Sequence, residues 1–183
     1  MSKQKVITVA AGHSNVDSGA VAKNGTKEAT LATQFRNAVV SYLQQDKNIH
    51  VKTDGHGTNN APLSEAIKLI AGSDVAVEFH MNASTNATAY GVETISLPKD
   101  KILAQQISLH VAEVFGSKLR GDNGWIDQSQ SARGKLGFVS KGGLIVELGF
   151  ISNEKELKAF NDKYWLAAKA VAEILIDYVN NKK

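Results

Sequence analysis

The sequence predicts an α/β domain built on a mostly parallel central sheet of about six strands, with helices on both faces of the sheet. Short runs rich in β-branched residues alternate along the chain with longer amphipathic stretches, which is the pattern of repeated strand–helix–strand units. The chain has 183 residues, a length that suits one domain with a sizeable core. We therefore expect residues 1–183 to form a single domain.

The strands are predicted where apolar, β-branched runs of four to eight residues are bounded by polar or glycine-containing segments. Five runs meet this description, and a weaker sixth precedes the last of them. They cover residues 6–10, 49–53, 75–80, 92–97, 137–140 (the weaker run) and 144–148.

The helices are predicted from apolar residues that recur at helical spacing. In the first of them Leu31, Phe35 and Val39 share one face, so this face belongs to the core. Thr26 is a suitable N-cap for this helix, and Pro62 suits the first position of the next one. The expected helices span residues 27–45, 63–71, 101–118, 154–160 and 164–179.

Two long segments carry no periodic pattern, residues 11–26 and 120–136. The second is rich in Gly, Asp, Asn, Gln and Ser. Functional residues in α/β domains collect on loops beside the strand ends. We expect these two loops to form the walls of a cleft.

The composition excludes several classes of protein. Cysteine is absent, so neither a disulfide framework nor a thiolate metal site can form. The net charge is +3, but Lys and Arg are scattered, so we expect no nucleic-acid partner. No apolar run approaches the ~18 residues of a membrane span. The run 6–11 is too short for a signal-peptide core, so we expect synthesis in the cytoplasm without an export signal. We expect a monomer by default.

Glu147 is the most informative residue. It lies near the end of an apolar strand, beside the glycine turn at Gly149, where an ionised side chain is costly to hold unless its charge is used. One use is structural, an ion pair with Lys141 or Arg133. The other is chemical, because a carboxylate beside a metal-bound water is the usual general base of metal-assisted hydrolysis.

Two histidines and a second carboxylate lie where they can converge with Glu147. His13 directly follows the first strand, His80 ends the third, and Glu28 falls in the first turn of a helix. Taken alone, Glu28 suits compensation of the helix dipole, and a single strand-end histidine is an ordinary polar residue. Together, two imidazoles and one carboxylate form a ligand set that suits one zinc ion, with a fourth position left for water.

Four ordered motifs resemble the zinc-dependent N-acetylmuramoyl-L-alanine amidases of the type 3 amidase family: residues 12–20 (GHSNVDSGA), Glu28, residues 80–82 (HMN) and residues 146–153 (VELGFISN). The resemblance implies that His13, Glu28 and His80 bind zinc and that Glu147 is catalytic. The implied reaction is hydrolysis of the amide between the lactyl group of N-acetylmuramic acid and the L-alanine of the peptidoglycan stem. We expect a catalytic domain without a separate wall-binding domain. It acts either as a phage endolysin, which reaches the cell wall once the membrane is breached, or as a mother-cell or prophage-encoded amidase.

Two residues depart from the family pattern. Glu78 lies two positions before His80, on the same face of the strand. It is either a hydrogen-bond partner of a ligand imidazole, an exposed strand residue, or a ligand in place of Glu28. His56, in a Gly-His-Gly sequence after the second strand, is expected at the cleft rim.

Two other functions remain open: a zinc peptidase that cuts within the stem peptide, and a non-catalytic cell-wall binding module.

Overall fold

Six strands form one sheet in the order β2-β1-β3-β6-β4-β5. The computed structural model describes residues 4–131 and 133–181. Strands β2, β1, β3 and β6 run parallel, β4 is antiparallel to β6, and β5 is parallel to β4. The mostly parallel six-stranded sheet is therefore as the sequence predicts. The strands are β1 (Lys5–Ala11), β2 (Ile49–Thr53), β3 (Val75–Asn82), β4 (Glu93–Ser96), β5 (Trp125–Asp127) and β6 (Leu144–Phe150).

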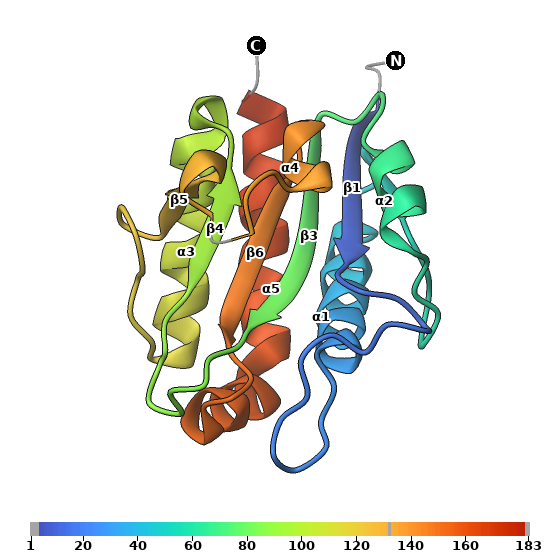
Figure 1. Ribbon diagram of the computed structural model, residues 1–183. Coiled ribbons are helices and arrows are strands. Elements are labelled where there is room, and N and C mark those ends of the chain that lie inside the picture. The colour runs from blue at the N-terminus through green and yellow to red at the C-terminus, as the bar shows by residue number, and fades with distance from the viewer. Residues whose placement is uncertain (1–3, 132, 182–183) are drawn as a thin grey trace.

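Helices cover both faces of the sheet (Figure 1). The three long helices pack on one face, where Phe35 and Phe79 meet edge to face with ring centroids 4.7 Å apart. Burial of side chains of this size stabilises the fold by about 1.5–3 kcal/mol each. Two short helices cover the other face around Phe138 and Ile145. The helices are α1 (Glu28–Leu43), α2 (Leu63–Leu69), α3 (Lys101–Phe115), α4 (Gly137–Ser140) and α5 (Glu154–Asn181), with 3-10 turns at Pro98–Asp100 and Gln128–Gln130.

Two strand predictions need correction. Residues 137–140, predicted as a weak strand, form the short helix α4, which buries Phe138 and Val139. So short an apolar run has no period of its own, and packing decided its conformation. Strand β5 lies inside the expected loop 120–136, because its three residues pair with the edge of β4. That pairing is non-local, so the sequence of the segment gives little sign of it.

Three helix predictions also need correction. Residues 154–160 and 164–179 belong to one continuous helix, α5, since the polar residues between them contain no helix breaker. The N-cap of α1 is Lys27 rather than Thr26, and it makes no side-chain capping bond. Pro62 is the N-cap of α2 and not its first helical residue.

The sheet brings the functional segments together. Strands β1, β3 and β6 are neighbours, with Ala11 beside Phe79 and His80 beside Glu147. Because these strands are parallel, their carboxyl ends meet at one edge of the sheet, and the residues that follow them share that edge.

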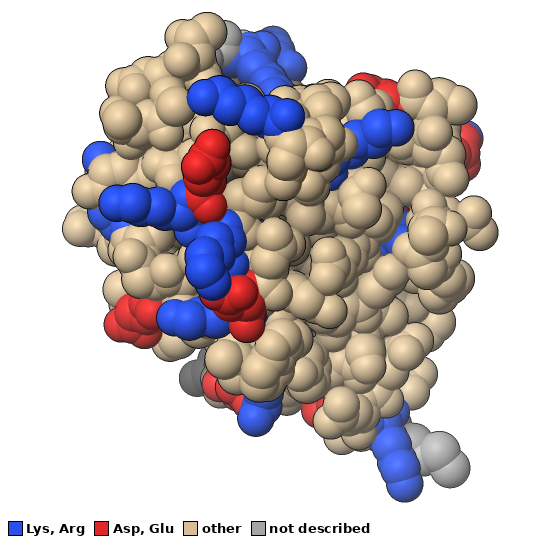
Figure 2. Space-filling model, turned by 90° about the horizontal axis from the view of Figure 1, so that it is seen from below, with Lys and Arg blue, Asp and Glu red and all other residues tan. Residues whose placement is uncertain are grey.

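The surface at this end of the molecule is shown in Figure 2. Lys and Arg side chains gather along one side of it, with Asp and Glu side chains among them. Over the rest of this face charged side chains are sparse. Within residues 4–131 and 133–181, no helix is both long and apolar enough to cross a membrane.

Candidate metal centre

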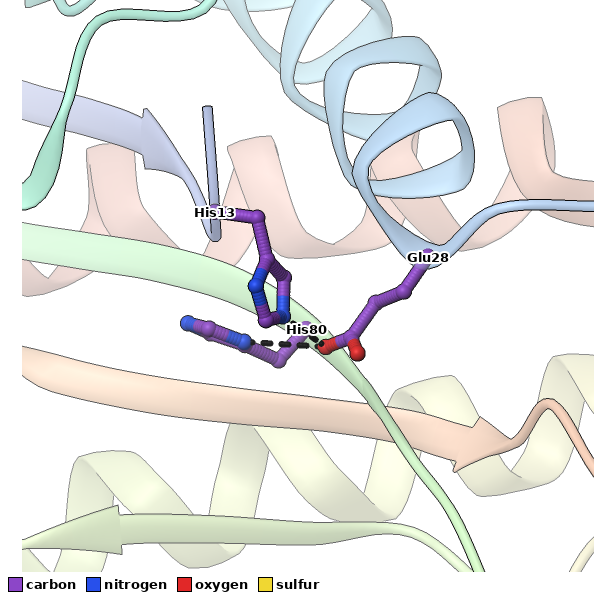
Figure 3. Close-up of side chains that lie close together, drawn as sticks. All are labelled: His13, Glu28 and His80. Atoms are coloured by element: carbon purple, nitrogen blue, oxygen red, sulfur yellow. Dashed lines mark hydrogen bonds and ion pairs between the residues drawn. The ribbon is translucent and has the colours of Figure 1, made fainter. Parts of the chain in front are cut away.

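His13, Glu28 and His80 each offer one ligand atom, and the three atoms lie within 4.8 Å of one another. The residues come from three different elements: the loop after β1, the first turn of α1 and the end of β3. Figure 3 shows both imidazoles directed toward the Glu28 carboxylate. The structure thus brings together the three residues that the sequence singled out.

The carboxylate of Glu28 is the centre of this cluster. Its Oε1 lies 3.0 Å from Nδ1 of His80 and 2.9 Å from Nε2 of His13, and it accepts a hydrogen bond from the Met81 amide. Its Oε2 accepts a hydrogen bond from the Ala20 amide at 3.0 Å. Burial raises the pKa of Glu28, but the nearby His13 and His80 imidazoles outweigh it and hold this pKa far below its usual range. Glu28 is therefore ionised.

His80 is buried between two carboxylates. Its Nδ1 faces Glu28 and its Nε2 lies 3.0 Å from Oε2 of Glu78. Burial lowers the pKa of His80, but the bonds to Glu28 and Glu78 raise it to about 10. At neutral pH the metal-free protein therefore holds a proton on His80.

His13 fits an ion better than it fits its protein neighbours. Its Nε2 is buried without a hydrogen-bond partner among the described residues, although it lies within ion-pair distance of Glu28. The distance is short, but the direction is not that of a hydrogen bond. A buried polar atom left in this way costs about 1–3 kcal/mol unless another partner satisfies it. Two imidazole nitrogens and a carboxylate oxygen that converge on one point are the donor set that zinc prefers.

The backbone around His13 is held in an uncommon conformation. His13 has φ 67°, in the left-handed region that non-glycine residues seldom adopt. The amide of Ala11 donates to Asp54 at 3.1 Å, and the carbonyl of Gly12 accepts from Asn60 at 2.8 Å. A Cβ at Gly12 would overlap the imidazole of His80, so only glycine fits beside that ring.

Arg36 stabilises the loop around His13 through Asp54. The sequence analysis missed this role. Its side chain is fully buried, and its guanidinium bonds Asp54 Oδ1 at 3.0 Å and the Asn59 carbonyl at 2.9 Å. Asp54 in turn holds Ala11. The helical spacing gave no sign of this burial, because adjacent residues of a helix point in different directions and Arg36 lies off the face of Leu31, Phe35 and Val39.

Glu147 lies beside His80 in the sheet and is buried. Burial raises the pKa of Glu147 to about 7, and the charge of His80 opposes this rise only in part. Its Oε2 has no hydrogen-bond partner among the described residues, which also offer it no ion pair. The structural alternative, a pair with Lys141 or Arg133, is therefore not what the described residues show.

Glu147 and the two histidines open into one cavity of about 320 Å³. The β1–α1 loop and the segment that leads into α4 contribute to its wall, in agreement with the prediction that the two long loops form a cleft. Much of the remaining wall is apolar. The lining residues are His13, Ser14, Asp17, Pro62, Leu63, Glu78, His80, Ile95, Arg133, Leu136, Gly137, Phe138, Ile145 and Glu147.

The two residues that depart from the family pattern are placed as follows. Glu78 is buried and hydrogen-bonded to the imidazole of His80, so the interpretation as an exposed strand residue is wrong. It does not belong to the three-residue cluster. His56 is exposed in the loop after β2 and does not line the cavity.

Comparisons with known proteins identify the family of this chain. The family model described as N-acetylmuramoyl-L-alanine amidase matches residues 7–177. A solved structure described as the putative N-acetylmuramoyl-L-alanine amidase from Neisseria meningitidis is 43% identical to this chain. The alignment covers 96% of each chain, and the TM-score is 0.88. A search of curated proteins gave no match.

Two more distant structures share the fold. One is the catalytic domain of CwlV, an N-acetylmuramoyl-L-alanine amidase from Bacillus (Paenibacillus) polymyxa var. colistinus, with 23% identity, TM-score 0.82 and coverage of 98% of this chain and 100% of that one. The other is an N-acetylmuramoyl-L-alanine amidase from Clostridium difficile 630, with 23% identity, TM-score 0.83 and full coverage of both chains. With 171 consecutive positions spanned by the family model, residues 7–177, the chain belongs to the N-acetylmuramoyl-L-alanine amidase family.

Proposed function

We propose that this amidase is zinc-dependent and hydrolyses the amide between the lactyl group of N-acetylmuramic acid and the L-alanine of the stem peptide. One observation carries the proposal: three ligand atoms converge, and two of their residues, His13 and His80, line the same cavity as Glu147, whose buried Oε2 has no hydrogen-bond partner among the described residues. Family membership supports the amide as the bond that is cut.

Nε2 of His13, Nδ1 of His80 and Oε1 of Glu28 would hold the ion. When bound, zinc supplies Lewis acidity, which polarises a carbonyl and lowers the pKa of water to about 7. The carboxylate of Glu28 supplies the negative charge of the ligand set, and the amides of Ala20 and Met81 fix its orientation. No rearrangement of these side chains is needed to bring the ligand atoms together.

Glu147 acts as the general base and then as the general acid. Its free Oε2 accepts a proton from the attacking water, and the same carboxyl later donates a proton to the nitrogen of the departing L-alanine. In the metal-free protein burial raises the pKa of Glu147 to about 7, and a carboxyl raised in this way is suited to both accepting and releasing a proton near neutral pH. The apolar wall formed by Ile95, Leu136 and Ile145 limits the access of bulk water.

Mass analysis of the products from purified peptidoglycan tests the proposal. Free stem peptides that begin with L-alanine, together with unbranched glycan, are the expected products. Shortened stems still attached to the sugar would replace the proposal with a zinc peptidase, and binding without any soluble product would indicate a wall-binding module. His13→Ala and His80→Ala should each abolish stoichiometric zinc, and full occupancy in either variant would remove that residue from the ligand set.

We also propose that the enzyme acts as an endolysin, which reaches the wall when the membrane is breached. The net charge of +3 supports this role weakly, since it favours approach to an anionic envelope. Expression in the cytoplasm should leave cells intact until a pore-forming protein is induced, and lysis should then follow. Lysis that is independent of the pore would contradict an endolysin role.

A further inference from the structure

Arg133 is the only Lys or Arg among the described residues that line the catalytic cavity, whereas three acids, Asp17, Glu78 and Glu147, line it as well. Two of these acids are already engaged. Asp17 bonds Nδ1 of His13, and Glu78 bonds Nε2 of His80. Glu147 is the proposed base, so the cavity offers substrate one positive group of constant charge.

The guanidinium of Arg133 has no partner within the described part of the chain. The side chain is exposed, and it forms no hydrogen bond or ion pair with any residue in 4–131 or 133–181. Its charge nevertheless reaches the interior, where it lowers the pKa of Glu147 against the larger effect of burial. Arg133 and Glu147 line one cavity, so a ligand beside Glu147 lies near a guanidinium that no described residue neutralises.

The loop that carries Arg133 is held at both ends. Oε1 of Gln128 accepts hydrogen bonds from the Leu136 amide and the Ser140 hydroxyl, both at 3.0 Å. The Arg133 amide donates to the Ser131 hydroxyl at 3.3 Å. These bonds tie Gln128 to Leu136 and Ser140, and Arg133 to Ser131.

We propose that Arg133 binds the free α-carboxylate of the second residue of the stem peptide. The inference rests on the proposed function, in which L-alanine is the first residue after the scissile amide. The second residue is a D-glutamate linked through its side chain, which leaves its α-carboxylate free, or a D-isoglutamine in which that group is an amide. An extended chain advances about 3.3–3.6 Å per residue, so this carboxylate lies roughly 7 Å from the scissile bond.

The guanidinium is suited to this choice between acid and amide. It offers two parallel N–H donors to a carboxylate and cannot form the same charge-assisted pair with an amide. A hydrogen bond to a charged group in a site of this kind changes binding by about 10- to 100-fold. Arg133 would therefore make the enzyme selective for stems with an unamidated second residue.

A pair of matched substrates tests the inference: N-acetylmuramoyl-L-alanyl-D-glutamate and N-acetylmuramoyl-L-alanyl-D-isoglutamine. The zinc-loaded wild type should cleave the acid with the higher kcat/KM. Arg133→Gln should raise KM for the acid by about 10- to 100-fold and leave the amide within about twofold. Lys135→Gln, at an exposed position outside the cavity lining, is the matched control and should change neither substrate. Equal losses on both substrates in Arg133→Gln would overturn the inference.

A binding measurement on an inactive variant tests the role of Arg133 independently of the proposed function. Calorimetry on Glu147→Gln, with the same two compounds as uncleaved ligands, should show tighter binding of the acid, and the added Arg133→Gln change should remove the preference. If the wild type cleaved neither compound, the proposed function would fail while the calorimetry still decided the role of Arg133. Equal affinities in the Glu147→Gln protein would overturn the role of Arg133 whatever the activity.

Discussion

Glu78 and Glu28 bond the two nitrogens of the same imidazole: Oε2 of Glu78 lies 3.0 Å from Nε2 of His80, and Oε1 of Glu28 lies 3.0 Å from Nδ1. His13 repeats the arrangement, with Asp17 at Nδ1 and Glu28 near Nε2. Each candidate ligand ring thus has its own carboxylate on the side away from Glu28. Such partners fix the orientation and tautomer of a ligand imidazole and raise its basicity.

Glu78→Gln should weaken zinc binding by about 10- to 100-fold while the fold is retained. The amide keeps the size of the side chain but removes the negative charge beside His80. Competition with a chromophoric chelator measures the affinity, and circular dichroism checks the fold. Asp17→Asn is the matched change at the other ring, where the smaller effect is expected because Asp17 is largely exposed. Unchanged zinc affinity in Glu78→Gln would show that the contact does not tune the ligand.

Glu147→Gln should keep zinc and the fold but lower kcat by about 10²- to 10⁴-fold, the usual contribution of a general base. Glutamine has nearly the same shape but cannot accept the proton. Zinc content by atomic absorption and turnover of a soluble muramoyl peptide are the two readouts. Turnover within about threefold of the wild type would require a different base.

Asp54→Asn should lower the free energy of unfolding by about 3–5 kcal/mol, because the fully buried guanidinium of Arg36 loses its counter-ion. Urea denaturation measures this loss. Lys68→Gln is the control: it breaks the exposed pair between Lys68 and Glu65, and the expected change is within about 1 kcal/mol. A loss below about 1 kcal/mol in Asp54→Asn would mean that water or another group compensates Arg36.

The same variant should also weaken zinc binding, because Asp54 holds the Ala11 amide two residues before His13. The affinity is measured at a temperature at which the variant is fully folded. If it matched the wild type, the network would stabilise the fold without positioning His13.

Zinc binding should release a proton and strengthen with pH. In the metal-free protein the pKa of His80 is raised from its ordinary value to about 10, so a proton occupies the ring throughout the neutral range and must leave before the nitrogen binds zinc. Apparent affinity should rise about tenfold per pH unit for this proton between roughly pH 7 and 9. Proton uptake by a weak indicator buffer during zinc addition measures the release directly.

The stability of the metal-free fold changes with pH in the opposite direction to the zinc affinity. A raised pKa in the folded state means that the charged His80 stabilises the metal-free fold fully below pH 6.5, and that this contribution disappears as pH rises toward 10. Zinc affinity that did not vary with pH would show that His80 is already neutral in the metal-free protein.

Much of the fold and of the site followed from local features of the sequence. The β-branched runs and the helical spacing of Leu31, Phe35 and Val39 predicted the parallel sheet and α1, because a repeated period along the chain reports which face is buried. His13 was predicted at the site because it follows a buried strand, and His80 because it lies at the end of one. Parallel strands end at one edge of a sheet, so such residues meet although they are far apart in sequence.

Where the period is short or absent, the predictions failed. Residues 137–140 became a helix, and Trp125–Asp127 became a strand, because contacts with other elements decided their conformation. Three or four residues carry too little local preference to resist those contacts.

The sequence by itself determined the class of fold, the order of its main elements and the identity of the residues that gather at the strand ends, since all of these depend on patterns within a segment. Only the tertiary structure decided that Arg36 is buried against Asp54, that Glu78 bonds His80 and that Arg133 lines the cavity with no partner among the described residues. The partners of a charged side chain come from distant segments, and the surroundings that those segments create set its burial and its pKa. No local period encodes them.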